Sequence, residues 1–147
     1  TPPKNLVKLL SDTEVSKIFH FARFDLAIIK KFLDVSCENI FCTKIASKLV
    51  RTYTDKHGLK DLCKELLGID LNKSQQSSDW SNESLSNNQI SYAASDVIYL
   101  NKLKEKLVEM KKKKKRLDLA NKIFTFLNTR VDLDILGWDG QDIFSHS

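Results

Sequence analysis

The chain is organised around residues 90–110, which read ISYAASDVIYLNKLKEKLVEM. Apolar side chains recur there at spacings of three and four, which predicts one long amphipathic helix. Ser86 and Gln89 just ahead match a capping box and so predict where this helix begins. On the helix, Tyr92 and Asp96 are four residues apart and share one face beside the apolar stripe. A packed helix can therefore aim the Asp96 carboxylate at a ligand.

A second carboxylate follows a predicted strand in the first part of the chain. Residues 17–21 (KIFHF) are β-prone and largely apolar, and residues 22–33 then show the apolar spacing of a helix. Asp25 falls in the first turn of that helix, where the helix dipole favours negative charge. Active-site side chains of α/β proteins often emerge at such a point, directly after the end of a strand.

The other segments are mostly helical in pattern. A short strand at residues 40–42 and a helix from Thr43, its expected N-cap, to Thr52 continue the strand–helix alternation of an α/β sheet. Further helices are expected over residues 6–10, over residues 58–67 with Gly68 as terminator, and over residues 117–127. The tail at residues 132–144 is expected to supply packing residues and no chemistry.

The two acidic motifs, His20-x-x-x-Phe24-Asp25 and Tyr92-x-x-x-Asp96, resemble those of the RNase D family of 3′–5′ exonucleases. Three intervening segments fall in the order and spacing of that family: residues 57–62 (HGLKDL), 65–68 (ELLG) and 73–80 (KSQQSSDW). One local departure is at residues 80–85, WSNESL, where many relatives read Trp-x-x-Arg-Pro-Leu. A basic substrate contact is therefore not expected there.

The resemblance implies an α/β fold of the RNase H-like exonuclease class, N-terminally truncated and mostly helical with a few short strands, as a single partial domain over residues 1–147. It implies that Asp25 and Asp96 bind Mg²⁺ or Mn²⁺, hard ions that prefer carboxylate oxygens. It also implies that the Tyr92 hydroxyl orients the attacking water in a two-metal hydrolysis of phosphodiesters. Substrate contacts are expected at His20, Phe24, Lys73 and Trp80. The implied partner is single-stranded RNA or the 3′ end of a structured RNA such as tRNA, with DNA left open.

The first motif of the family, an Asp-x-Glu on an apolar strand, has no convincing counterpart. Asp12-Thr13-Glu14 has the right letters, but it follows Leu9-Leu10-Ser11 without an apolar β-run and lies about a dozen residues before Asp25. We therefore interpret it as a solvated turn or helix end. With two of the family's four metal-binding carboxylates, the chain is expected to bind metal ions weakly and to have little or no activity alone.

Two functions stay open on these residues. The chain is either a 3′–5′ exoribonuclease whose missing strand is supplied by a longer product or a partner chain, or a non-catalytic RNA-binding module or decayed fragment. A purely structural, all-helical interaction protein is a third reading, against which the β-prone residues 17–21 argue. Within the motifs, His20 has a structural hydrogen-bonding role or a role in proton transfer, and the first is favoured. The basic run at residues 111–116 is either a solvated segment between helices or a phosphate-binding one.

Charge and cysteine content narrow the class of protein. The net charge of +5 favours polyanionic partners. The three cysteines, Cys37, Cys42 and Cys63, form no CxxC pair, which favours reduced thiols in a cytoplasmic protein over disulfides or a zinc site. Neither a membrane span nor a signal peptide is indicated.

Overall fold

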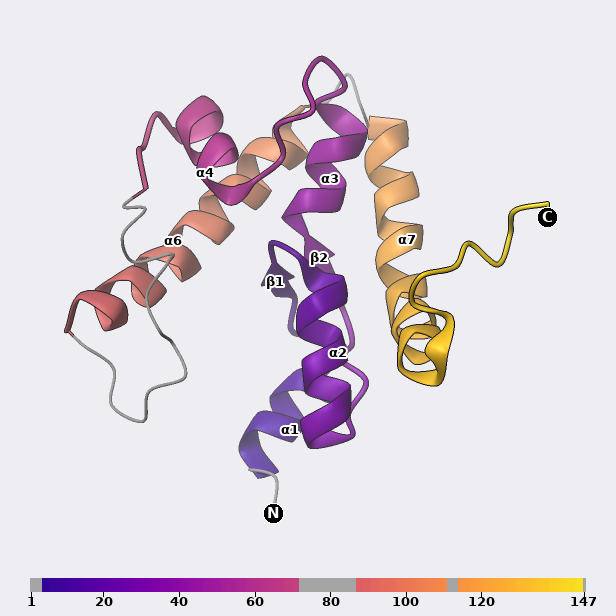
Figure 1. The fold of residues 1–147 in the computed structure, drawn as a ribbon. Coiled ribbons are helices and arrows are strands. Elements are labelled where there is room, and N and C mark those ends of the chain that lie inside the picture. Colours follow the sequence, from indigo (N-terminus) through magenta and orange to yellow (C-terminus); the bar gives the residue numbers. More distant parts are fainter. Residues whose placement is uncertain (1–3, 72–86, 111–113, 147) are drawn as a thin grey trace.

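The structure is a computed structural model that describes residues 4–71, 87–110 and 114–146, with the backbone alone at residues 87–97 and 114. In chain order its elements are α1 (Lys4–Ser11), β1 (Lys17–Phe19), α2 (Ala22–Leu33), β2 (Ile40–Cys42), α3 (Thr43–Val50), α4 (Leu59–Leu62), the π-helix η1 (Cys63–Leu67), α6 (Asn87–Glu109), α7 (Lys114–Leu133) and the π-helical turn η3 (Asp134–Trp138). Figure 1 shows α2 and α3 in the middle, with α6 on one side and α7 on the other.

The two strands form a parallel pair in which Ile18 lies opposite Phe41. Parallel pairing requires a crossover, and α2 provides it, so β1, α2 and β2 make one βαβ unit. The three residues of β2 are buried and those of β1 are half-buried. The α/β class with few, short strands is therefore confirmed. Strand β1 is shorter than expected, because it ends at Phe19 and Phe21 is already the N-cap residue of α2.

Helix α2 has the predicted limits. Ala22 and Leu26 are buried on its inner face, while Ile29 and Leu33 pack beside the core. The helix ends where Asp34 adopts a left-handed conformation with φ of 53°. The other apolar side chains of the predicted helix face solvent: Phe24, Ile28 and Phe32 are exposed.

Helix α3 confirms the predicted helix but not its cap. Thr43 is the first helical residue, Cys42 takes the N-cap position, and no side chain caps the helix. The Thr43 hydroxyl instead donates to the Phe19 carbonyl oxygen at 3.3 Å, which ties the start of α3 to the end of β1. The helix ends at Val50, two residues earlier than expected.

The predicted helix over residues 58–67 is confirmed as α4 followed by η1, and Gly68 ends it with φ of 67°. A glycine suits this position because it adopts positive φ without steric cost.

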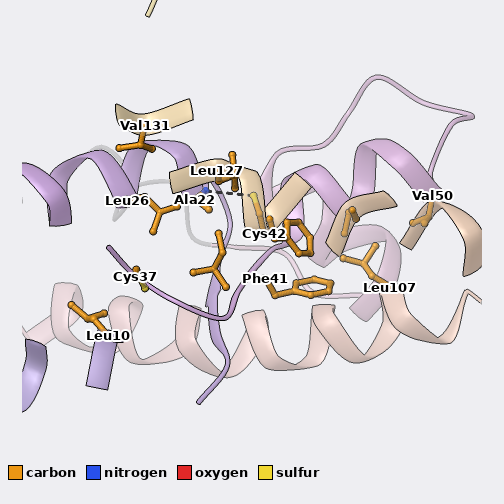
Figure 2. Packing of buried hydrophobic residues seen from close by; sticks show 14 residues of the cluster. Leu10, Ala22, Leu26, Cys37, Phe41, Cys42, Val50, Leu107, Leu127 and Val131 are labelled. Carbon is orange, nitrogen blue, oxygen red and sulfur yellow. Dashed lines mark hydrogen bonds between the residues drawn. The ribbon is translucent and has the colours of Figure 1, made fainter. Parts of the chain in front are cut away.

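The long helices α6 and α7 complete the core. Helix α7 packs on α2, α3 and β2, and α6 packs on α3, β1 and η1. Leu103 and Leu107 of the predicted α6 stripe are fully buried. In α7, Ala120, Phe124 and Leu127 are buried, and Leu117 and Ile123 are partly buried. Figure 2 shows how side chains from α1, α2, β2, α3, α6 and α7 meet, and how the Ala22 N–H points at the Cys42 sulfur, which accepts it at 3.4 Å. Both helices are longer than predicted, and α7 absorbs the first residues of the expected tail.

The C-terminal tail behaves differently from the prediction. Leu136, Trp138 and Phe144 are exposed and pack little, whereas Asp134 is only 13% exposed and forms ion pairs. The expectation that this segment supplies no chemistry stays a prediction. The expected packing role is wrong for these apolar side chains, because they are exposed and ion pairs hold the segment instead. The physical reason is that η3 ends α7 beside α2, where a carboxylate meets two arginines.

Candidate functional site

The candidate site lies at the carboxyl ends of the two parallel strands, where β1 leads into α2 and β2 leads into α3 (Figure 1). His20 and Asp25 follow β1, and Thr43 and Lys44 follow β2. The Lys44 N–H donates to the His20 carbonyl oxygen at 3.1 Å, so the two helix starts are held together. In parallel α/β sheets, ligands bind outside this edge.

Asp25 is held in the first turn of α2 with no cation beside it. Its side chain is half-buried, and among the described residues no hydrogen bond or ion pair reaches its carboxylate. Burial raises the pKa of this carboxyl above its ordinary value, because the charged form is poorly solvated. A carboxylate kept in this state is suited to bind a cation that is not part of the chain.

His20 is a half-buried, uncharged imidazole. Its Nδ1 lies 2.9 Å from Thr43 Oγ1, whose hydroxyl hydrogen points to Phe19, so Nδ1–H is the donor and Nε2 carries the lone pair. Burial, and then the positive charge of Lys44, lower the pKa of His20 to about 4. The backbone of His57 lies near the ring and opposes this lowering of the pKa. It forms no hydrogen bond with Nε2, which has no partner among the described residues. This geometry agrees with the hydrogen-bonding role favoured from the sequence.

A buried polar stripe on α3 supports the segment that follows it. Thr43, Ser47 and Arg51 are four residues apart in turn and are all buried. Ser47 Oγ lies 2.7 Å from His57 Nδ1, and Arg51 Nη1 donates to Ser47 Oγ at 2.8 Å. Arg51 Nη1 also donates to the Lys56 carbonyl oxygen, so the stripe fixes residues 56 and 57 against α3. Sequence reasoning missed Arg51, although polar residues at helical spacing within a buried helix were the available signal.

An ion-pair cluster ties α2 to the C-terminal segment. Arg23 donates from Nε and Nη2 to the two oxygens of Asp134, at 2.7 Å each, and Arg130 Nε donates to Asp134 Oδ1 at 3.0 Å. The hydrogen bonds from Arg23, more than any other cause, hold the pKa of Asp134 below its ordinary value. Arg23 lies two residues before Asp25, so the cluster helps to fix the helix that carries this carboxylate. No local sequence pattern signals a pair that is 111 residues apart.

Of the predicted site residues, the structure describes the side chains of His20, Phe24 and Asp25, which all lie where β1 leads into α2. Tyr92 and Asp96 lie in α6, whose helical backbone agrees with their predicted shared face, but their side chains lie outside the described residues. Lys73 and Trp80 lie outside them altogether, and so do residues 111–113 of the basic run. Within residues 4–71, 98–110 and 115–146, no three His, Cys, Asp or Glu side chains group as metal ligands.

Asp12 and Glu14 are confirmed as part of a solvated turn after α1. Asp12 Oδ1 accepts the Glu14 N–H at 2.9 Å, and the turn contributes to no strand. The Asp-x-Glu letters therefore do not mark a metal-binding strand.

Comparison with known proteins identifies the family. The sequence pattern of the family described as 3′–5′ exonuclease matches residues 3–112. The chain belongs to the 3′–5′ exonuclease family. The predicted RNase D-like character and exonuclease fold are thereby confirmed.

Relatives within the family include bacterial RNase D proteins. RNase D of Gluconacetobacter diazotrophicus is 38% identical over 110 residues, which cover 75% of this chain and 28% of that protein. RNase D of Granulibacter bethesdensis is 34% identical over 82% of this chain and 30% of its own length. The chain thus spans under a third of the length of these two relatives.

One solved structure is similar to this chain over a larger share of its own length. Brucella melitensis NrnC is 54% identical, with a TM-score of 0.89 over 97% of this chain and 69% of that chain. The same protein has been solved with bound Mg²⁺, at a TM-score of 0.88, and bound to pGG, at 0.89. Across the described part of the chain, no helix is long and apolar enough to span a membrane.

Proposed function

We propose that this chain is a 3′–5′ exonuclease domain, spanning residues 1–147, that shortens RNA from its 3′ end. The observation that carries the proposal is Asp25. It is a half-buried carboxylate at the carboxyl end of β1, and within the described residues no ion pair reaches it. A solved nuclease 52% identical to this chain contains Mg²⁺, which supports a metal role for such a carboxylate.

Asp25 fits a divalent ion by its chemistry, because hard cations prefer carboxylate oxygens. Asp25 and Asp96 would hold Mg²⁺ or Mn²⁺, and the Tyr92 hydroxyl would position the attacking water. When bound, such an ion lowers the pKa of that water and stabilises negative charge on the reacting oxygens. His20 is uncharged at neutral pH, so we assign it to substrate contact and to positioning through Thr43.

Metal binding by the chain alone is expected to be weak. Two neighbouring dications need several carboxylates to offset their repulsion, and the Asp12 and Glu14 turn contributes none. Slow hydrolysis that rises with metal concentration follows from this shortage of ligands.

Two observations support RNA as the substrate, and a third supports a reducing compartment. NrnC has been solved bound to pGG, and this chain carries a net charge of +5. All three cysteines are buried and none forms a disulfide, which favours the cytoplasm. Besides Phe24, we propose Lys73 and Trp80 as substrate contacts.

The test is digestion of 5′-labelled single-stranded RNA over a series of Mn²⁺ concentrations. We expect slow shortening from the 3′ end that increases with Mn²⁺ and is abolished by Asp25→Asn. Asp12→Asn is the matched control, because this carboxylate lies in the turn after α1, and it should leave the rate unchanged. RNA that stays bound but intact would instead favour a non-catalytic RNA-binding module.

A further inference from the structure

Two exposed aromatic rings stand beside Asp25. Phe21 and Phe24 are 49% and 58% exposed. Their planes are within 13° of parallel, with ring centroids 6.3 Å apart. Burying these rings in the core would be the ordinary outcome for phenylalanine, but the helix directs Ala22 and Leu26 inward in their place. The pair therefore presents flat apolar surface to solvent next to the candidate site.

A lysine lies over one ring of this aromatic pair. Lys44 Nζ is 5.0 Å from the centre of the Phe21 ring, and its charge also acts on His20. In the part of the chain that the structure describes, no carboxylate lies within ion-pair distance of this ammonium group. Its position at the start of α3 places a positive charge at the strand edge that also carries Asp25.

We propose that Phe21, Phe24 and Lys44 form a nucleotide subsite beside Asp25, in which a base of single-stranded RNA stacks on the rings and a phosphate pairs with Lys44. This inference rests on the proposed function and names how that site holds its substrate. A base offers a flat π-face to an aromatic ring whatever its sequence, and a lysine supplies the matching charge for the backbone. The arrangement predicts that unpaired nucleotides are preferred, because a base in a duplex cannot leave its stack without cost.

The same helix contains a natural control. Phe32 lies on the same exposed side of α2, is 77% exposed, and is separated from Asp25 by nearly two helical turns. Non-specific hydrophobic binding of RNA to exposed phenylalanine would occur equally at Phe32. A subsite built around Asp25 would not include Phe32.

The experiment measures binding of fluorescein-labelled single-stranded RNA by anisotropy, in Ca²⁺ and with the RNA checked for integrity on a gel. Phe24→Ala should weaken binding by roughly 5- to 150-fold, the range seen for loss of one stacked base. Phe24→Tyr should restore it, and Phe32→Ala should leave it unchanged. On an RNA whose two 3′-terminal residues are abasic, Phe24→Ala should have no effect.

Lys44 is tested through the dependence of binding on salt. Lys44→Ala should lower the slope of log K against log salt concentration by about one, as for one lost phosphate contact. Lys48→Ala, one turn further along α3 and exposed, should not change the slope.

The outcomes separate this inference from the function on which it rests. Binding by the unmodified chain that Phe24→Ala and Lys44→Ala leave unchanged would overturn the subsite alone. Equal losses for Phe24→Ala and Phe32→Ala would also overturn it. Failure of the unmodified chain to bind RNA would overturn the proposed function and the subsite together.

Discussion

Arg51 and Glu65 are joined by two parallel hydrogen bonds, in which Nε and Nη2 of the guanidinium each donate to a carboxylate oxygen at 2.9 Å. The Arg51 side chain is 2% exposed, whereas that of Glu65 is 39% exposed. A buried guanidinium is therefore paired with a partly exposed carboxylate of η1. The pair fixes the end of α3 to that helix. Planar, bidentate pairs of this kind combine strength with a defined geometry.

Glu65→Gln should destabilise the fold, because it removes the charge that compensates the buried Arg51. Breaking a buried pair costs about 3–5 kcal/mol, and the exposure of Glu65 places the expected loss at or below about 3 kcal/mol in the free energy of unfolding. Urea denaturation measures it. Lys64→Gln changes the exposed neighbour in η1 and serves as the control. Equal stability of the two variants would contradict this account.

His20 should make stability depend on pH between about 4 and 6.5. Its pKa falls from 6.5 to about 4 in the fold, so the unfolded chain binds a proton in this interval and the folded chain does not. Stability must therefore decrease as pH falls from 6.5 towards 4, by a total of about 3 kcal/mol for a shift of this size. Urea titrations at several pH values measure the loss, and His20→Asn should remove it. An unchanged pH dependence in that variant would show that another group is responsible.

Asp25→Asn should raise the stability of the metal-free protein. Burial raises the pKa of Asp25, so its charged form is disfavoured by folding and destabilises the protein at neutral pH. Removing the charge is expected to increase the melting temperature by a few degrees, about 4 °C for each 1 kcal/mol. The same variant should lose the stabilisation that Mn²⁺ gives to the unmodified chain.

A matched carboxylate gives the opposite expectation. Asp61 is in the first turn of α4, where a negative charge favours the helix. Asp61→Asn should thus lower the melting temperature slightly or leave it unchanged. An increase equal to that of Asp25→Asn would mean that the loss of any carboxylate, and not the burial of Asp25, explains the effect.

The ion pairs of Asp134 should stabilise the fold in mild acid until the Asp134 carboxyl becomes protonated. The hydrogen bonds from Arg23 depress its folded pKa below the ordinary 3.8, so its contribution is present above that value and is lost as pH falls through the folded pKa. Asp134→Asn should reduce stability at pH 7 and flatten the acid limb of the pH–stability curve. Asp118→Asn, at an exposed position of α7, is the control and should reproduce the unmodified curve.

Elements with a repeating local pattern were predictable from the sequence. The limits of α2 match because residues 22–33 contain no glycine or proline and bury one face at helical spacing. The strand at residues 17–21 was predicted too long. His20 continues the β-prone pattern in the sequence, but in the structure its side chain hydrogen-bonds to Thr43 beyond the end of the strand. Thr43 was expected to cap α3 because threonine is a common N-cap residue. It does not cap the helix, because its hydroxyl donates to the Phe19 carbonyl oxygen instead.

The supporting side chains of the site were not predictable in the same way. Asp25 and His20 could be proposed as site residues because they form part of a contiguous motif. Arg51 and Asp134 act through partners that are brought close only by the tertiary fold, and Asp134 pairs across 111 residues. Periodicity reports the environment of a residue within its own element and carries no information on such pairs.

The long span between Arg23 and Asp134 also bears on how the protein forms during synthesis. The β1–α2–β2 unit is local in sequence and can fold early, whereas the Arg23 contact requires residue 134 to have left the ribosome. Until then, the emerging chain can form α2 but cannot anchor it to the C-terminal segment. The helix that carries Asp25 would therefore acquire this anchor only after residue 134 has been synthesised.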